Sequence, residues 1–261
     1  MTGFTEWTLD GCCSEGGGAR GLVQAGHYVV GVDIDKTCRE GYLRSGAHEF
    51  VHASILDVLA DRSFLSRFTF TTQHPPCQGY SGMSNCRPGL ADQYERLIRP
   101  IHALLEANWG GRPYVIENVW GARGELPDPV VMCMWMFGRK TYRHRVLWPG
   151  GGLVLTPPRP PAPGSMDAFL PRRLNRECGW PHPVPTARAG HWEPGMFVSV
   201  AGHERKAPVL EVMEIDWMST RDRIKEAIPP YLGYWVAEQL AAWRTAQAAT
   251  ALRSYRLAGT A

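Results

Sequence analysis

A cysteine in a constrained turn is the residue of this sequence best suited to covalent chemistry. Cys77 stands in the segment PPCQGYS, residues 75–81, directly after a short apolar stretch. Two prolines restrict the backbone before the cysteine, and a glycine permits a sharp turn after it. A buried cysteine is usually an inert apolar residue, but a rigid turn is also a good way to fix a nucleophile. We therefore predict that Cys77 is a nucleophile.

Charged side chains follow the later apolar stretches. Glu117 and Asn118 come directly after the apolar residues 114–116, where a carboxylate would lie at the same sheet edge as Cys77. Arg143 and Arg145 alternate with His144, so in a strand the two guanidinium groups project from one face. An acid that only caps a loop and a solvated basic edge are the alternative interpretations.

A glycine-rich turn occupies residues 10–22, which read DGCCSEGGGARGL. Glycines let the backbone approach a ligand closely, and the helix that follows offers free N–H groups. Asp33, at the end of the next apolar stretch, could accept hydrogen bonds from both ribose hydroxyls of a nucleoside-like cofactor. A turn that serves packing alone is the alternative.

These side chains need strands and helices that bring them to one place. The apolar patterns predict strands at 5–10, 28–33, 68–72, 114–117 and 142–148, and helices at 19–25, 36–44 and 91–109. Asp35 is expected to cap the second helix, and the last strand could run antiparallel. This alternation predicts an α/β fold, a mostly parallel sheet with helices on both faces and a ligand site beyond the carboxyl ends of its strands.

The composition changes sharply after residue 149. The runs TPPRPPAP and PHPVP cannot hold a regular helix or a central strand, so residues 150–208 are expected to form a small loop-rich region. Regular patterns return at 209–218 and 231–245, and the last dozen residues are expected to fray. We therefore predict a catalytic and cofactor-binding domain at 1–149 and a C-terminal segment, 209–261, that returns to it.

Overall composition limits the class of protein. The chain of 261 residues has 44% hydrophobic and 20% charged residues, with neither a signal peptide nor a long apolar run, so we expect a cytoplasmic protein that does not enter a membrane. Seven cysteines without a CxxC pair support neither a disulfide framework nor a structural metal. A net charge of +3 does not establish a nucleic-acid partner, although basic residues cluster locally at Arg139, Lys140, Arg143 and Arg145.

Taken in order, these segments resemble the motifs of the DNA cytosine-5 methyltransferase family, in particular its small prokaryotic or phage members. The glycine turn is similar to the cofactor loop of that family, residues 29–35 to its ribose-binding strand, and residues 75–81 to its proline-cysteine loop. Residues 117–119 match its Glu-Asn-Val motif, residues 141–145 its paired-arginine strand, and residues 227–240 the segment that folds back onto the cofactor domain. The loop-rich region at 150–208 would then be the target recognition region.

The resemblance implies a Rossmann-like fold and methyl transfer from S-adenosylmethionine, without a metal, to carbon 5 of a cytosine flipped out of double-stranded DNA. Cys77 would add to carbon 6 of the base, and Glu117 would hold N3 and the exocyclic amine. S-adenosylhomocysteine would be the product. The short insert suggests a recognition sequence of a few base pairs, and we expect a monomer that works in a bacterial or phage-infected cell.

The resemblance also assigns three groups of residues. The catalytic residues are Cys77, Glu117, Asn118, Arg143 and Arg145. The cofactor-binding residues are Asp10, Cys12, Glu15, Gly16, Gly17, Asp33, Ile34, Ser54, Ile55 and Pro76. The DNA-binding residues are Gln78, Ser81, Arg172, Arg173, Arg176 and Arg188.

The sequence departs from the family around the cofactor. Ser14 replaces a glycine, Cys12 an aromatic residue, Ser54 an aspartate, and the pair Lys225-Glu226 a glycine-asparagine pair. Each lost hydrogen bond would weaken cofactor binding by roughly 1 kcal/mol. These changes favour one alternative, a catalytically silent DNA-binding relative; an RNA cytosine-5 methyltransferase would share every motif. A nicotinamide-dependent enzyme fits least, because the glycines do not match GxGxxG.

Overall fold

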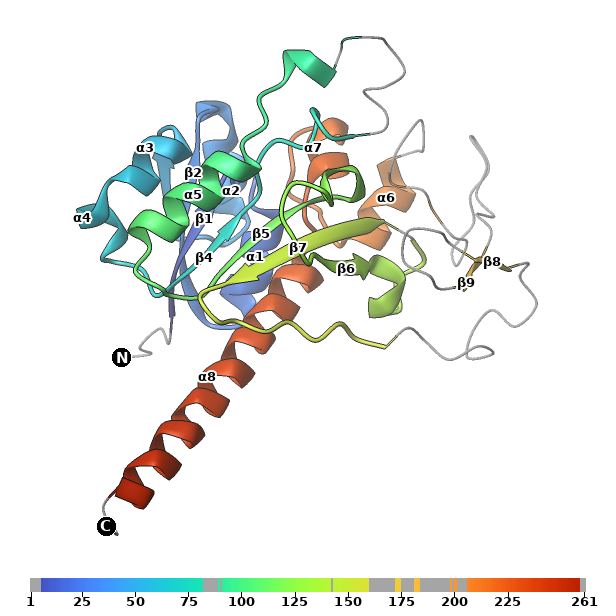
Figure 1. Cartoon of the computed structure of the whole chain (residues 1–261). Helices are drawn as coiled ribbons and strands as arrows, with labels where there is room; N and C mark the ends of the chain where they lie inside the picture. Colours follow the sequence, from blue (N-terminus) through green and yellow to red (C-terminus); the bar gives the residue numbers. More distant parts are fainter. Residues whose placement is uncertain are drawn as a thin grey trace.

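The computed structural model describes residues 6–81, 89, 91–141, 143–159, 172–174, 181–183, 198, 200 and 206–258. Its main feature is a seven-stranded sheet in the order β3-β2-β1-β4-β5-β7-β6 (Figure 1). The strands are β1 (Glu6–Gly11), β2 (His27–Asp33), β3 (Glu49–His52), β4 (Phe70–Gln73), β5 (Tyr114–Val119), β6 (Val130–Cys133) and β7 (His144–Gly150). The first five are parallel, whereas β7 runs antiparallel to both of its neighbours. The predicted α/β fold class is confirmed.

Helices cover both faces of this sheet, as predicted. The helices along the chain are α1 (Gly17–Gln24), α2 (Arg39–Arg44), α3 (Ile55–Ala60), α4 (Arg62–Leu65), α5 (Ile98–Asn108), α6 (Lys206–Met213), α7 (Arg221–Glu226) and α8 (Pro230–Ala258). Short 3-10 turns lie at Lys36–Cys38, Ala91–Gln93, Trp120–Ala122 and Met134–Phe137, and a separate hairpin pairs β8 (Arg172–Leu174) with β9 (Pro181–Pro183). Among the described helices, none has the length and apolar character to cross a bilayer.

Two hydrophobic cores lie on opposite faces of the sheet. One buries Leu22 of α1, Tyr42 of α2 and Trp235 of α8 against Val29 and Phe70. The other packs α3 and α5 against the alternate residues of the same strands, with Val30 of β2 as one example. Neighbouring residues of β2 thus face different cores, which is why this strand reads as a continuous apolar run.

Two predictions of element length are wrong. The expected helix at 91–109 is a 3-10 turn, a break and then α5. Pro100 lies in the first turn of α5, and because it has no N–H and its ring clashes with the carbonyl four residues earlier, the helix cannot continue back through residue 96. The regular pattern expected at 231–245 is part of a longer helix, because α8 begins at Pro230 and continues to Ala258 through an alanine-rich stretch of high helix propensity. Fraying of the last dozen residues stays a prediction.

The sheet places a ligand site at its centre. The chain runs from β1 outward to β2 and β3, and then returns across β1 to β4 and β5. Adjacent parallel strands whose connections leave in opposite directions open a crevice at their carboxyl ends. Here that crevice lies beyond β1 and β4, and it receives the glycine turn and the Cys77 loop.

Candidate active site

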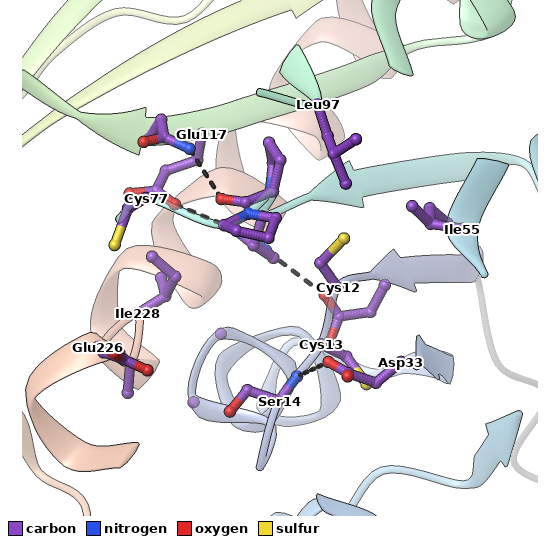
Figure 2. Close-up of a pocket in the computed structure, with 18 of the residues that line it drawn as sticks. Cys12, Cys13, Ser14, Asp33, Ile55, Cys77, Leu97, Glu117, Glu226 and Ile228 are labelled. Atoms are coloured by element: carbon purple, nitrogen blue, oxygen red, sulfur yellow. Dashed lines mark hydrogen bonds and ion pairs between the residues drawn. The ribbon is translucent and has the colours of Figure 1, made fainter. Parts of the chain in front are cut away.

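A pocket of about 380 Å³ opens at the carboxyl ends of β1, β2, β4 and β5. Figure 2 shows Cys77 and Glu117 at one end of this pocket, with Ser14 and Asp33 at the other. The predicted residues that line it are Asp10, Cys12, Gly17, Asp33, Ile34, Ser54, Ile55, Pro76, Cys77, Gln78, Glu117, Asn118 and Arg145. The glycine turn and the cysteine loop therefore face one cavity.

The glycine turn is bent by left-handed backbone. Cys12, Ser14 and Gly16 have φ angles of 54°, 46° and 76°. A side chain at such an angle costs about 1–2 kcal/mol, which explains why glycine suits the position of Ser14. The turn is held by the backbone N–H of Ser14, which donates to Asp33 Oδ2 at 2.8 Å.

The end of the pocket opposite Cys77 has side chains that could bind a nucleoside. Each carboxylate oxygen of Asp33 accepts one backbone N–H, from Ser14 and from Asp35, and a carboxylate oxygen has a second lone pair to offer. Ile34 lines the pocket and yet keeps 74% of its surface exposed, and Ile55 lies nearby. A ribose against Asp33 and an aromatic base against the two isoleucines would satisfy both features.

Cys77 follows β4 in a loop that is anchored from β5. Asn118 Nδ2 donates to the carbonyl oxygen of Pro75 at 2.8 Å, and the N–H of Tyr80 donates to the Cys77 carbonyl at 3.0 Å. Burial raises the pKa of the Cys77 thiol, and Arg145 opposes this rise. Asn118 thus holds the backbone that carries the thiol, and this contact gives it a positional role.

Glu117 is held between two basic side chains. Its Oε1 lies 2.6 Å from Nε of Arg145 in a buried ion pair, and its Oε2 lies 3.3 Å from Nδ1 of His74. The Arg145 contact lacks hydrogen-bond geometry, so among the described residues Glu117 Oε1 has no hydrogen-bond partner. This oxygen is ion-paired with Arg145, and its remaining lone pair could accept a hydrogen bond from a ligand.

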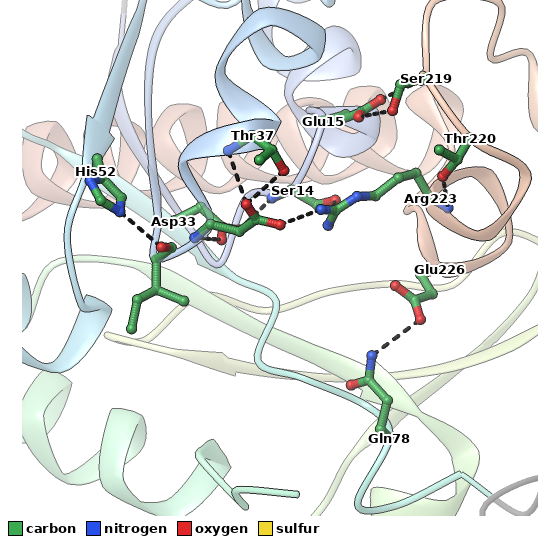
Figure 3. A network of polar contacts seen from close by, with 12 residues as sticks. Ser14, Glu15, Asp33, Thr37, His52, Gln78, Ser219, Thr220, Arg223 and Glu226 are labelled. Atoms are coloured by element: carbon green, nitrogen blue, oxygen red, sulfur yellow. Dashed lines mark hydrogen bonds and ion pairs between the residues drawn. The ribbon is translucent and has the colours of Figure 1, made fainter.

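The C-terminal segment completes the pocket. Arg223 of α7 pairs with Asp35 and approaches Ser14 Oγ at 3.5 Å, and Gln78 donates to Glu226 Oε1 at 3.1 Å (Figure 3). Sequence reasoning missed Arg223 and His74 as pocket residues, whereas Glu226 is one of the positions at which the sequence departs from the family around the cofactor. That departure and the resemblance of residues 227–240 to a returning segment pointed to this part of the chain.

Several predicted residues do not reach the pocket. The carboxylate of Glu15 is buried and accepts hydrogen bonds from the backbone and hydroxyl of Ser219, and Gly16 lies beside Ser45. Arg143 does not line the pocket; its Nη1 lies 3.8 Å from Met213 Sδ, and burial, followed by the charge of Arg145, lowers its pKa to about 9. Ser81 is also outside the lining.

The predicted DNA-binding arginines are only partly described. Arg172 and Arg173 lie on β8, where the structure describes the backbone alone. Arg176 and Arg188 lie outside the described residues. Their roles stay predictions.

Comparison with solved structures identifies the fold. A prophage-encoded protein of E. coli, described as a candidate DNA modification methyltransferase, superposes with a TM-score of 0.61 at 14% identity over 90% of this chain and 98% of its own. The Dnmt2 methyltransferase of S. pombe gives 0.57 at 11% identity over 91% and 99%, and the Entamoeba histolytica methyltransferase EhMeth gives 0.52 at 12% over 90% and 97%. No protein-family profile and no curated protein sequence matches the chain. The chain therefore has the α/β methyltransferase fold of these structures, which is the fold that its motifs predict.

Proposed function

We propose that this protein transfers a methyl group from S-adenosylmethionine to carbon 5 of cytosine in DNA, with Cys77 as the covalent nucleophile. One observation carries the proposal. Asp33 and Ile34, which suit a nucleoside, line the same pocket as Cys77, Glu117 and Arg145, which suit chemistry on a base. A methyl donor and an acceptor base could therefore meet in one cavity.

The residues present fit the cofactor. Asp33 would accept the ribose hydroxyls, Ile34 and Ile55 would contact the adenine, and the turn before α1 would face the amino-acid end. When bound, S-adenosylmethionine supplies an electrophilic methyl group on a sulfonium sulfur. Glu15, which points to Ser219, would support the glycine turn from behind.

The base chemistry follows from Cys77 and Glu117. Cys77 first loses its thiol proton to solvent, and the thiolate then adds to carbon 6 of the cytosine, which makes carbon 5 nucleophilic. Glu117 takes up a proton, donates it to N3, and accepts a hydrogen bond from the exocyclic amine at Oε1. Arg145 stabilises the thiolate, since its charge opposes the raised pKa of Cys77. After methylation, carbon 5 loses its proton to solvent, N3 returns its proton to Glu117, and Cys77 leaves as a thiolate.

Double-stranded DNA is the proposed partner. A cytosine in a stacked duplex cannot reach the Cys77 thiol, so the base must be flipped out at a cost of about a few kcal/mol. We assign recognition of the neighbouring bases to residues 150–208 and the catalytic domain to residues 1–149, joined by the returning segment 209–261. We further propose that the enzyme acts as a monomer.

The test is transfer of radiolabelled methyl to unmethylated duplex DNA, with transfer RNA as a parallel substrate. We expect labelled 5-methylcytosine with the natural protein, none with Cys77→Ala, and near-normal labelling with Cys133→Ala, which removes a buried thiol outside the pocket. Labelling of RNA alone would replace DNA by RNA in the proposal. Labelling of neither substrate would favour a catalytically silent relative.

A further inference from the structure

His74 joins the two halves of the pocket. It lies between β4 and the Cys77 loop, with its side chain 17% exposed. Its Nε2 lies 3.4 Å from Asp10 Oδ1, and its Nδ1 lies 3.3 Å from Glu117 Oε2. Each ring nitrogen therefore faces a carboxylate. A neutral imidazole has a single N–H and would set a lone pair against one of these carboxylates, whereas the imidazolium donates to both.

The groups around His74 favour this charged form. Asp10 also accepts hydrogen bonds from Tyr42 Oη at 3.2 Å and Thr72 Oγ1 at 3.3 Å, so it is held as an acceptor. Across the ring, Arg145 balances the second oxygen of Glu117. On the α1 side, Gly18 lies near Nε2 of His74 and brings no charge. Burial alone would lower the pKa of His74, but the hydrogen bonds and charges of Asp10 and Glu117 raise it to about 9.

We propose that His74 is a positioning residue that orients Glu117 and supplies the proton that Glu117 gives to N3 of the target base. The inference rests on the proposed function. As the bond between Cys77 Sγ and carbon 6 forms, the Nδ1 proton of His74 moves to Glu117 Oε2, and Glu117 passes a proton on to N3. When Cys77 leaves, N3 returns its proton to Glu117 and then to His74. The cycle consumes no proton at these three groups.

His74→Asn is the informative variant, because the asparagine amide keeps an N–H donor near the position of Nδ1 but has no proton to transfer. His102→Asn on α5 is the matched control, since His102 faces Tyr114 and does not line the pocket. We would measure single-turnover methyl transfer at saturating cofactor and DNA from pH 6 to pH 10. The natural protein and His102→Asn should gain rate as Cys77 ionises and lose rate near pH 9. His74→Asn should be about 100-fold slower at pH 7.5, a typical contribution of acid catalysis, and should lack the loss at high pH.

If the role of His74 were merely structural, His74→Asn would be slower at every pH and would still lose rate near pH 9, the descending limb of the profile. Because the pKa of Arg143 also lies near 9, a limb that survives in His74→Asn would be assigned to Arg143 and would overturn the proposal. A second measurement needs no activity: ring NMR of His74 should show an imidazolium at pH 7.5 that becomes neutral in Glu117→Gln. A neutral ring in the natural protein would overturn the proposal. Failure of the natural protein to methylate DNA or RNA would instead count against the proposed function.

Discussion

Four charged side chains determine how readily Cys77 ionises. After burial, which raises the pKa of its thiol, the strongest influence is Arg145, which lowers that pKa; Glu117 and Glu226 raise it, and Arg143 lowers it. Without a bound base, Cys77 is therefore held as a thiol. Of these four, Glu226 belongs to α7, and it faces the cysteine loop through Gln78.

Glu226→Gln should make Cys77 more reactive. The change removes a negative charge near the thiol, so the pKa of Cys77 should fall and its alkylation by iodoacetamide at pH 8 should become about threefold faster. Glu238→Gln, an exposed position on α8, is the control and should leave the rate unchanged. An unchanged or slower rate in Glu226→Gln would show that Glu226 does not govern the thiol.

His74 should make the free energy of unfolding depend on pH in the alkaline range. Its pKa in the folded protein, about 9, lies above the ordinary value of 6.5. The stabilisation is therefore fully present below about pH 6.5 and is lost as the pH rises through 9. In urea unfolding from pH 6 to pH 10, the natural protein should lose more free energy of unfolding than His74→Asn, with His102→Asn following the natural protein. Parallel curves for all three proteins would contradict the charged state of His74.

At the scale of elements, α1 and α8 meet through glycines. A Cβ atom on Gly21 would lie 1.9 Å from the carbonyl oxygen of Pro230, and one on Gly233 would lie 2.1 Å from the carbonyl oxygen of Gly18. No side chain fits between backbones at this distance, since real Cβ contacts are above 3 Å. This contact brings the end of α7 against the start of α1, and so against the pocket.

Gly233→Ala should separate the two helices and cost about 3 kcal/mol of unfolding free energy. Gly124→Ala is the control, because Gly124 has open space around it and no left-handed backbone. Thermal unfolding of both variants would measure the difference. Equal stability would mean that α8 can shift on α1 without loss.

The sequence predicts the strands near the pocket better than it predicts the long-range side-chain contacts around the pocket. Strands β1, β2, β4 and β5 follow from apolar runs. Cys77 lies in the loop after β4 and Glu117 in the second half of β5, so their proximity follows from parallel topology. Short elements such as β3 and α4 contain too few apolar residues to show a clear hydrophobic periodicity in the sequence. Arg223 and Asp35 are 188 residues apart, and no local pattern relates such a pair.

At the scale of the whole molecule, α8 extends beyond the body of the protein (Figure 1). One face of its first half is buried, and Arg244 binds Glu6 at the start of β1. Farther along, Leu252 and Tyr255 are 62% and 81% exposed. The two halves of this helix therefore contribute unequally to stability.

A chain that ends at Ala248 should melt within about 2 °C of the full chain, because it loses only exposed surface. A chain that ends at Gln239 loses buried Leu240 and the Arg244 contact, and should melt about 10 °C lower. Differential scanning calorimetry would separate the two cases. A large fall in melting temperature for the chain that ends at Ala248 would show that the projecting half stabilises the fold.

The pairing of Arg223 with Asp35 also determines when the pocket can form during translation. At about 5–20 residues per second, a ribosome needs roughly 10–40 s to travel from Asp35 to Arg223. Within that interval the ribosome also makes the cysteine loop, while the side of the pocket that α7 covers is still open. A new polypeptide can therefore complete this pocket only after α7 has been synthesised.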